Sequence, residues 1–334
     1  MLPMRKIFFL FVPLFLLISG CTSMYLPPTA QTEIPVFEKD GPIRIALVLG
    51  GGGSKGLAHL GAIRELEAAG IRPDLIVGCS AGAIIGALYA DDPDLKGMEE
   101  KLFSLRRSDL LDINFFARFG LVQGKSLEKF MEKNLRSKTF SDLKIPLIVA
   151  ATDLFTGDLI ELSHDAIPPA VRASCSFPGV FKPVLLYGRY LIDGGAANPV
   201  PVEIAKKYGA DVIIAIDVSE KLPTPKPHHL FGVAKRGMEI TCQKLVEKSL
   251  SDADVVIKME FQDVGLFSDH MNEEIYAHGR EKVTALLPQI KNFLATKQIQ
   301  VPVFSELSNP EKIIPFPIPS YVEEGEVAVE INAP

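Results

Sequence analysis

The chain has 334 residues, of which 47% are hydrophobic and 23% are charged, so it can bury one substantial core and form a large domain with or without an extension. Its formal net charge of −6 offers no basic surface to a phosphate backbone, which excludes nucleic acid as an expected partner. A weakly acidic surface does not exclude a membrane, because lipid is also contacted through apolar side chains or a covalent anchor.

The N-terminus has the pattern of an export signal. Two basic residues precede an apolar run over residues 7–18, which is shorter than the roughly 20 residues that a spanning helix needs. The sequence ISGC at residues 18–21 resembles a bacterial lipobox. We therefore expect residues 1–20 to be a lipoprotein signal peptide and Cys21 to be lipidated. Because Thr22 rather than Asp follows, the pattern indicates the outer membrane, facing the periplasm. An ordinary signal peptide with an incidental cysteine is the alternative.

The elements that follow have an α/β order. Residues 22–41 are polar and contain prolines, which predicts a tether. Residues 44–49 form a β-rich run that ends in glycines, and a helical pattern follows over residues 55–69. A second apolar run at residues 74–78 leads into a small-residue helix over residues 81–90. Strand, loop and helix repeated in this way predict parallel strands.

Further elements are predicted along the rest of the chain. Strands are expected at residues 147–152, 190–192 and 211–218, and helices at residues 127–135, 201–208, 231–250 and 273–294. We interpret the apolar side chains of Phe115, Phe116, Phe119 and Leu121 as a buried helix face, with a lipid-facing lid as the alternative. After residue 301 the chain is proline-rich and acidic, which indicates a wrapping or mobile tail.

The sequence Gly78-Cys79-Ser80-Ala81-Gly82 is a G-x-S-x-G motif between a predicted strand and a predicted helix. A sharp turn in this context lifts the serine hydroxyl off the sheet, and the flanking glycines leave room for the turn. The amide of Ala81 then lies at a helix N-terminus, where it favours a developing oxyanion. Ser80 is therefore the candidate nucleophile.

A glycine loop precedes the first helix. Residues Gly51, Gly52, Gly53, Ser54, Lys55 and Gly56 formally match the G-x-G-x-x-G dinucleotide fingerprint. The next strand ends at Gly78 instead of the acidic residue that binds a ribose, and no Gly-Lys-Ser/Thr of a P-loop is present. We therefore expect these amides to bind a tetrahedral oxyanion rather than a nucleotide. Lys55 either adds charge there or is a solvated helix start.

The serine needs a base, and no histidine lies in the strand-end setting of a hydrolase histidine. His59 falls inside the first predicted helix, where a packed histidine is the preferred interpretation. Asp193, followed by Gly194 and Gly195, lies at the end of a short predicted strand, where glycines permit close backbone approach. An ordinary Asp-Gly turn is the alternative.

Four cysteines are present. With Cys21 assigned to the lipid, Cys79, Cys175 and Cys242 remain. An odd number at irregular spacing favours neither a disulfide framework nor a zinc site, so we expect buried thiols. Whether Cys79 and Cys175 lie close together depends on the fold.

The motifs GGGSKG, GCSAG and DGG, in this order, resemble the patatin-like phospholipase family in its bacterial, lipoprotein form. The resemblance runs from about residue 43 to about residue 218, and the stretches at residues 150–154 and 173–181 are also typical of the family. It implies Ser80 as nucleophile, Asp193 as general base and the loop at residues 51–56 as oxyanion hole, without histidine. It further implies an acyl-enzyme formed from phospholipid or lysophospholipid, with no metal and no cofactor.

The resemblance implies a three-layer α/β/α fold with a central, mainly parallel sheet. We expect a lipidated tether at residues 21–41, a patatin-like catalytic domain at residues 42–230, a helical part packed on it at residues 231–300 and a tail at residues 301–334. A general esterase or thioesterase with the same dyad, and a catalytically idle envelope lipoprotein, are the alternative functions.

Overall fold

The computed structural model describes residues 29–39, 41–114, 119–219, 230–261 and 271–301, together with residues 222, 227 and 264. The predicted signal peptide, Cys21 and almost all of the predicted tail lie outside the described residues, as do Phe115 and Phe116. No helix of the described part has both the length and the apolar character required to cross a bilayer.

The core of the fold is a mixed, mainly parallel sheet in the order β5-β6-β3-β2-β1-β7-β8, with β4 paired to β3. The strands β8, β7, β1, β2 and β3 run parallel, whereas β4, β5 and β6 are antiparallel to their neighbours. Their bounds are β1 Ile45–Leu49, β2 Leu75–Cys79, β3 Leu147–Asp153, β4 Leu159–Leu162, β5 Val184–Leu186, β6 Arg189–Asp193, β7 Val212–Asp217 and β8 Val255–Lys258. The predicted α/β class is confirmed.

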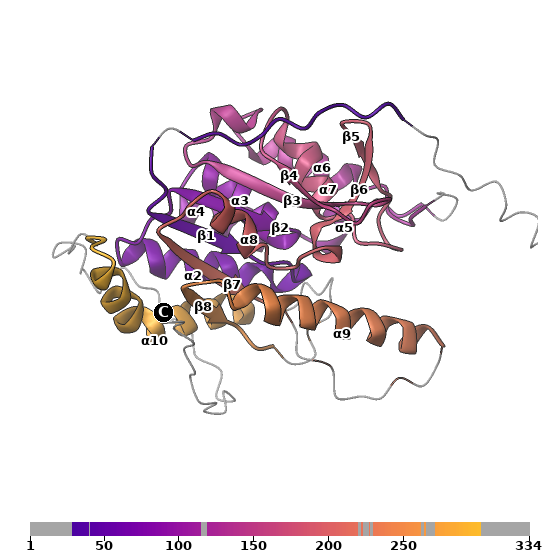
Figure 1. The fold of residues 1–334 in the computed structure, drawn as a ribbon. Coiled ribbons are helices and arrows are strands. Elements are labelled where there is room, and N and C mark those ends of the chain that lie inside the picture. The colour runs from indigo at the N-terminus through magenta and orange to yellow at the C-terminus, as the bar shows by residue number, and fades with distance from the viewer. Residues whose placement is uncertain are drawn as a thin grey trace, which may run out of the picture.

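Alternation along the strands creates two buried faces. In β1, Ile45, Leu47 and Leu49 pack in one hydrophobic cluster, and Ala46 and Val48 pack in the other. The first face is covered by α2 Leu57–Ala68, α3 Ala81–Asp91, α4 Leu95–Phe103, α6 Lys125–Asn134, α7 Ile167–Ser174 and α10 Asn272–Thr296. The second is covered by α8 Val202–Lys207 and α9 Leu230–Leu250. Figure 1 shows the three layers that result.

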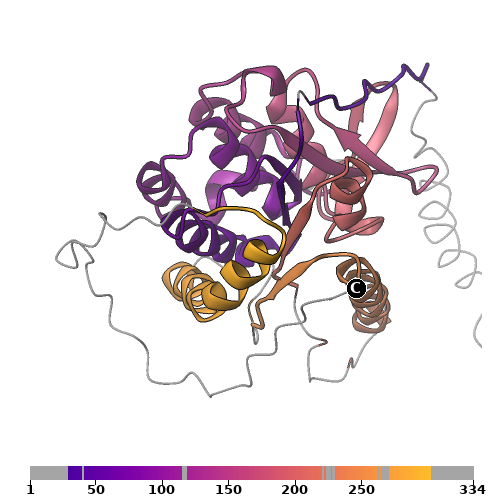
Figure 2. The same cartoon turned by 60° about the vertical axis from the view of Figure 1, so that its left-hand side comes forward.

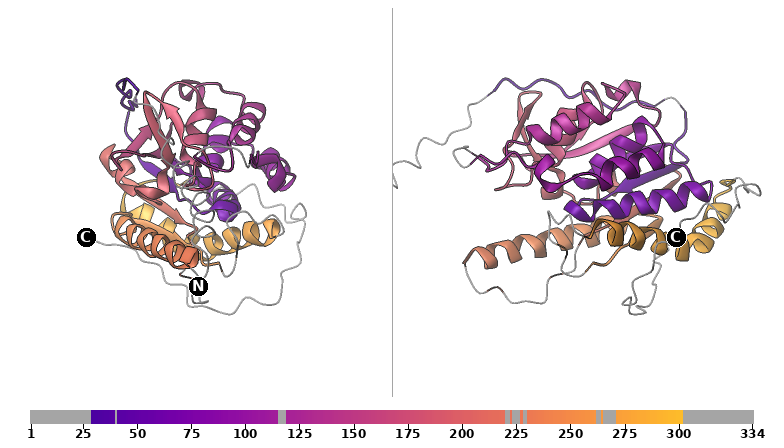
Figure 3. Two further views of the ribbon diagram at one scale, coloured as in Figure 1. Left: turned by 90° about the vertical axis from the view of Figure 1, so that its right-hand side faces the viewer. Right: turned by 180° about the vertical axis from the view of Figure 1, so that it is seen from behind.

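The C-terminal part of the chain covers both sides of the sheet. Figure 2 shows α10 beside α2 on one side and α9 on the other, with β8 between them. The two helices α2 and α10 approach closely because glycines face each other's backbone: a Cβ atom at Gly61 would overlap the Tyr276 carbonyl, and one at Gly279 the Ala58 carbonyl. In Figure 3 the first turns of α9 extend past the neighbouring elements.

Several elements differ from the sequence-based expectations. The part after residue 231 is not purely helical, because β8 adds an edge strand beside β7. The short strands β4 and β5 and the helices α4, α5 (Arg107–Leu110) and α7 were not predicted. The buried-helix interpretation is wrong for Leu121, which lies outside any helix and is 49% exposed. Such short or proline-initiated segments carry too few residues to show a clear period.

Candidate active site

The nucleophile turn connects β2, which ends at Cys79, to α3, which begins at Ala81. Between them Ser80 has φ 52° and ψ −120°, a conformation that costs an L-residue on the order of 1–3 kcal/mol. Glycines make the turn possible: a Cβ atom at Gly78 would lie 2.7 Å from Ala83 Cα, and one at Gly82 would overlap the Leu49 carbonyl. The motif therefore has the strained geometry of a nucleophile elbow.

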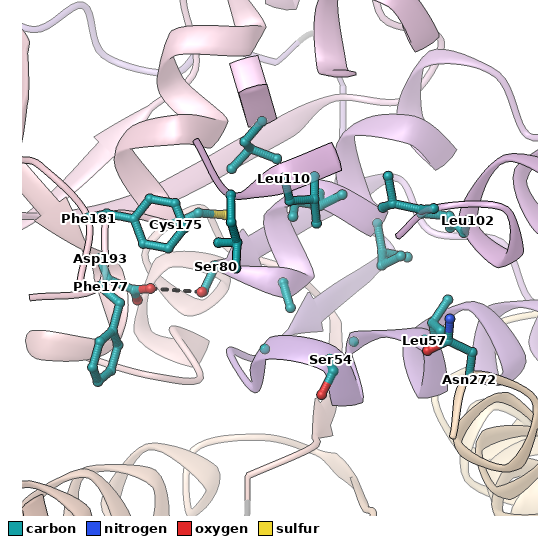
Figure 4. A pocket seen from close by; sticks show the side chains of 18 of the residues that line it. Ser54, Leu57, Ser80, Leu102, Leu110, Cys175, Phe177, Phe181, Asp193 and Asn272 are labelled. Carbon is teal, nitrogen blue, oxygen red and sulfur yellow. Dashed lines mark hydrogen bonds between the residues drawn. The ribbon is translucent and has the colours of Figure 1, made fainter. Parts of the chain in front are cut away.

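Asp193 lies beside Ser80 on β6, a strand that runs in the opposite direction to β2 and β3. It is the last residue of β6, which runs antiparallel to β3 and pairs Asp193 with Ala151. The last residue of β2, Cys79, pairs with the adjacent Ala150. The two strands therefore end beside each other, and Ser80 Oγ donates a hydrogen bond of 2.8 Å to Asp193 Oδ2 (Figure 4).

Burial changes the chemistry of this carboxylate. Asp193 is 5% exposed, and desolvation raises its pKa to about 6, against the opposing effect of hydrogen bonds from the Gly195 amide and the Ser80 hydroxyl. The Gly195 amide donates to Asp193 Oδ1 at 2.8 Å. Gly194 must be glycine, because a Cβ atom there would lie 2.5 Å from the Ala150 carbonyl oxygen. A carboxylate with this pKa is ionised at neutral pH and is a stronger base than an exposed aspartate.

The glycine loop packs directly on the nucleophile turn. Its 3-10 turn, η2 Gly53–Gly56, is part of the wall around Ser80. A Cβ atom at Gly56 would lie 2.7 Å from that of Ala81, and one at Gly51 would lie 3.3 Å from Ser80 Cβ. A side chain on these glycines would therefore separate the loop from the serine.

The amides of this loop do not all face the serine, which corrects the prediction for two of them. The Gly51 amide donates to the Pro199 carbonyl at 2.9 Å, and the Lys55 amide closes the turn onto the Gly52 carbonyl at 3.3 Å. For the amides of Gly53 and Ala81, no acceptor lies in the described part of the chain. Both residues line the pocket that contains Ser80, so these two amides are candidates for the oxyanion hole.

Lys55 is not a solvated helix start, because it is only 4% exposed. Its charge favours the ionised form of Asp217, a fully buried carboxyl at the end of β7 whose pKa is nevertheless raised by burial. The solvated interpretation is therefore wrong, whereas a contribution of the Lys55 charge to an oxyanion stays a prediction.

His59 is a packed histidine, as the sequence indicated. It is fully buried on α2, and burial lowers its pKa to about 4 although its hydrogen bond to Gly50 opposes the shift. Its Nε2 lies 2.8 Å from the Gly50 carbonyl oxygen, so Nε2 carries the proton and donates. The neutral ring holds the start of the glycine loop, and the hydroxyl of Ser80 is bonded to Asp193 instead.

The three described cysteines are free thiols gathered around the base. Cys79 Sγ lies 4.0 Å from Asp193 Oδ1, and Cys242 Sγ lies 3.9 Å from the Gly195 carbonyl. Burial, followed by the nearby Asp193 charge, raises the pKa of both Cys79 and Cys175. These thiols are therefore protonated packing groups rather than nucleophiles.

An apolar pocket of about 170 Å³ opens beside Ser80 and Asp193. In Figure 4, Phe177 and Phe181 lie on the Asp193 side, whereas Leu110, Leu102 and Leu57 extend away from the serine. Arg106 and Asp193 are the charged residues among those lining the pocket, and Arg106 is exposed. No group of three or more potential metal-binding side chains occurs among the described residues.

Sequence reasoning missed the supporting hydroxyls of the site. Ser174 and Thr152 contact the backbone of Ser80 and Asp193 respectively. Both lie in the stretches at residues 150–154 and 173–181, whose sequences resemble the family, but isolated hydroxyl residues carry no signal that predicts a contact across the fold.

Comparison with known proteins identifies a family for part of the chain. Residues 47–206 match the family model described as patatin-like phospholipase. Patatin-like phospholipase domain-containing protein 6 of Mus musculus is 32% identical over 185 residues, which cover 53% of this chain and 14% of that protein. Lysophospholipase nte1 of Aspergillus fumigatus is 35% identical over 180 residues, which cover 52% of this chain and 12% of that protein. The chain thus spans a small fraction of the length of these relatives.

The fold is also similar to a solved structure. The crystal structure of VipD from Legionella pneumophila superposes with a TM-score of 0.52 at 17% identity, covering 82% of this chain and 72% of that one. This similarity concerns the fold alone. The match over residues 47–206, a stretch that contains both Ser80 and Asp193, makes this part of the chain a patatin-like phospholipase domain.

Proposed function

We propose that this protein hydrolyses acyl esters of phospholipids or lysophospholipids through Ser80 and Asp193. The observation that carries the proposal is the 2.8 Å hydrogen bond from Ser80 Oγ to the buried Asp193 carboxylate at the wall of an apolar pocket. This contact supports the proposal because ester hydrolysis by a serine needs a hydroxyl, a base of suitable pKa and an apolar site for the acyl chain.

The mechanism follows from the contacts. As Ser80 Oγ attacks the acyl carbonyl carbon, Asp193 Oδ2 accepts the hydroxyl proton. Negative charge develops on the carbonyl oxygen, where the amides of Gly53 and Ala81 stabilise it. The alcohol leaves with the proton from Asp193 and the acyl group stays on Ser80. Asp193 then deprotonates a water that attacks the acyl-enzyme. The bond between the acyl carbon and Ser80 Oγ breaks, Oγ takes back the proton from Asp193, and the fatty acid is released.

The pocket supports a lipid substrate. Its lining is dominated by aliphatic and aromatic side chains, which favour a hydrocarbon chain over a polar acid. Arg106 adds a positive charge at an exposed position of the lining, and no hydrogen-bond or ion-pair partner of its side chain lies in the described part of the chain. A phosphate-bearing head group suits that charge better than a neutral one.

The test is fatty-acid release from three esters with the same acyl chain: lysophosphatidylcholine, monoacylglycerol and a nitrophenyl ester. We expect the wild type to cleave the lysophospholipid most efficiently, and Ser80→Ala and Asp193→Asn each to lose at least about 10³-fold in kcat. Cleavage of the nitrophenyl ester alone would indicate a general esterase. If the wild type releases no fatty acid from any of the three, the proposal is wrong.

We also propose that the protein is exported and anchored to the outer membrane, facing the periplasm, by a lipid on Cys21.

 The lipid-anchor proposal is supported by the sequence pattern at residues 1–21. It is also supported by the increase in effective substrate concentration that an anchored enzyme gains. Radioactive palmitate fed to expressing bacterial cells should label the wild type but not Cys21→Ser. Equal labelling of both would show that Cys21 is not the anchor.

A further inference from the structure

The end of β3 contacts both halves of the catalytic pair. Cys79, which precedes the nucleophile, pairs with Ala150, and Asp193 pairs with Ala151. Any shift of β2 or β6 against β3 therefore changes the separation between Ser80 and Asp193. Two buried hydroxyl groups, those of Ser174 and Thr152, lie at this junction and are not used in the mechanism described above.

The Ser174 hydroxyl connects the nucleophile to β3. Ser174 is the last residue of α7 and is fully buried. Its Oγ donates to the Ala150 carbonyl oxygen at 2.6 Å and accepts a hydrogen bond of 2.8 Å from the Ser80 amide. Because Ser80 has a strained backbone, a fixed partner for its amide selects this conformation over relaxed alternatives.

The Thr152 hydroxyl connects Asp193 to β3, as the Ser174 hydroxyl connects Ser80 to it. Thr152 lies on β3 itself and is 3% exposed. Its Oγ1 donates to the Asp193 carbonyl oxygen at 2.9 Å and accepts from the Ala197 amide at 3.2 Å. One side chain thus binds Asp193, the first residue of the Asp-Gly-Gly motif, and Ala197, the residue after the 3-10 turn Gly194–Ala196.

We infer that Ser174 and Thr152 are positioning residues, which hold the backbones of Ser80 and Asp193 against the end of β3 at the distance needed for proton transfer. The inference rests on the proposed function. Neither residue lines the pocket, so neither contacts the substrate. Loss of either hydroxyl would leave buried backbone groups unpaired and allow the pair to separate, and a displacement of about 1 Å costs on the order of 10²-fold in rate.

The test uses variants that change the hydroxyl and little else. Thr152→Val removes it at nearly constant shape, Thr152→Ser restores it, and Ser174→Ala removes the second one. Ser163→Ala is the control, because Ser163 is also buried but its hydroxyl bonds to His164 Nδ1 at 3.0 Å, away from the pair. For each variant we would measure kcat and KM on a soluble nitrophenyl ester, the rate of inactivation by a fluorophosphonate, and Tm.

We expect Thr152→Val and Ser174→Ala to lower kcat and the inactivation rate by about 10- to 100-fold, with KM within about threefold of the wild type. Thr152→Ser should recover most of the rate, and Ser163→Ala should keep it. The inference is overturned if Thr152→Val keeps the wild-type kcat, or if Thr152→Ser is as slow as Thr152→Val at an unchanged Tm.

These outcomes are separable from failure of the proposed function. Normal rates for the hydroxyl variants with an inactive Ser80→Ala would overturn the positioning role and leave the hydrolase intact. A wild type that neither cleaves an ester nor reacts with the fluorophosphonate would overturn both.

Discussion

At the scale of single residues, the central feature is that the proposed base is a carboxylate rather than an imidazole. Asp193 owes its basicity to burial, which raises its pKa to about 6. His59 donates a hydrogen bond to the Gly50 carbonyl and stays neutral because burial lowers its pKa. These environments support the proposal that Asp193 transfers the proton and that His59 makes a structural contact.

The first prediction concerns pH. Asp193 accepts a proton from Ser80 only when it is ionised, so kcat/KM should rise as the pH increases through about 6 and then reach a plateau. The profile would be measured from pH 4.5 to pH 8.5 on a neutral ester. A midpoint near 4, as for an exposed aspartate, would contradict a base whose pKa is raised by burial.

The second prediction concerns stability. The raised pKa means that the native state binds the proton more tightly than the unfolded chain does, so the ionised carboxyl destabilises the fold above about pH 6 and this penalty disappears below about pH 4. Asp193→Asn should therefore raise the free energy of unfolding at pH 8 by about 1–3 kcal/mol while abolishing activity. Denaturant unfolding at pH 8 and pH 4 would test it; an equal gain at both would rule out the electrostatic cause.

The third prediction separates His59 from catalysis. Glutamine can still donate a hydrogen bond to the Gly50 carbonyl, whereas leucine cannot. We expect His59→Gln to retain at least about a tenth of the wild-type kcat and His59→Leu to lose stability by about 1–3 kcal/mol. Steady-state kinetics and thermal unfolding would measure both. A folded but inactive His59→Gln would make the histidine part of the catalytic machinery.

At the scale of elements, local patterns predicted the strand and helix that surround each motif. The strand–turn–helix around Ser80 follows from an apolar run, a pair of glycines and a small-residue helix. The antiparallel direction of β6 and its register on β3 do not follow from any local pattern, because pairing between distant strands depends on the whole chain. The contact between Ser80 and Asp193 was therefore expected from the family resemblance and not from periodicity.

The fourth prediction tests the packing of α10 on α2. An alanine Cβ at Gly279 would overlap the Ala58 carbonyl, whereas one at Gly237 in α9 would have no neighbour within 4 Å. Gly279→Ala should therefore lower the free energy of unfolding by about 1–3 kcal/mol. Gly237→Ala is the matched control and should raise it by up to about 1 kcal/mol, because alanine favours a helix. Equal effects in denaturant unfolding would show that α10 does not pack closely on α2.

At the scale of the whole molecule, composition and element order predicted a layered α/β domain, and the sheet with helices on both faces confirms it. The sequence did not predict that the part after residue 231 completes the sheet with β8 and covers both of its faces, since these contacts join segments far apart in the chain. The arrangement leaves the carboxyl ends of β2 and β6 at one place beside an apolar pocket, where the proposed chemistry occurs.

The most direct test of this account is to identify the residue that a long-chain fluorophosphonate modifies, by peptide mass spectrometry of the wild type, Asp193→Asn and His59→Gln. A serine dyad predicts one adduct, on Ser80, formed rapidly by the wild type and His59→Gln and at least about 10²-fold more slowly by Asp193→Asn. An adduct elsewhere, or equal rates for the wild type and Asp193→Asn with loss in His59→Gln, would contradict the assignment of Ser80 and Asp193 as the catalytic pair.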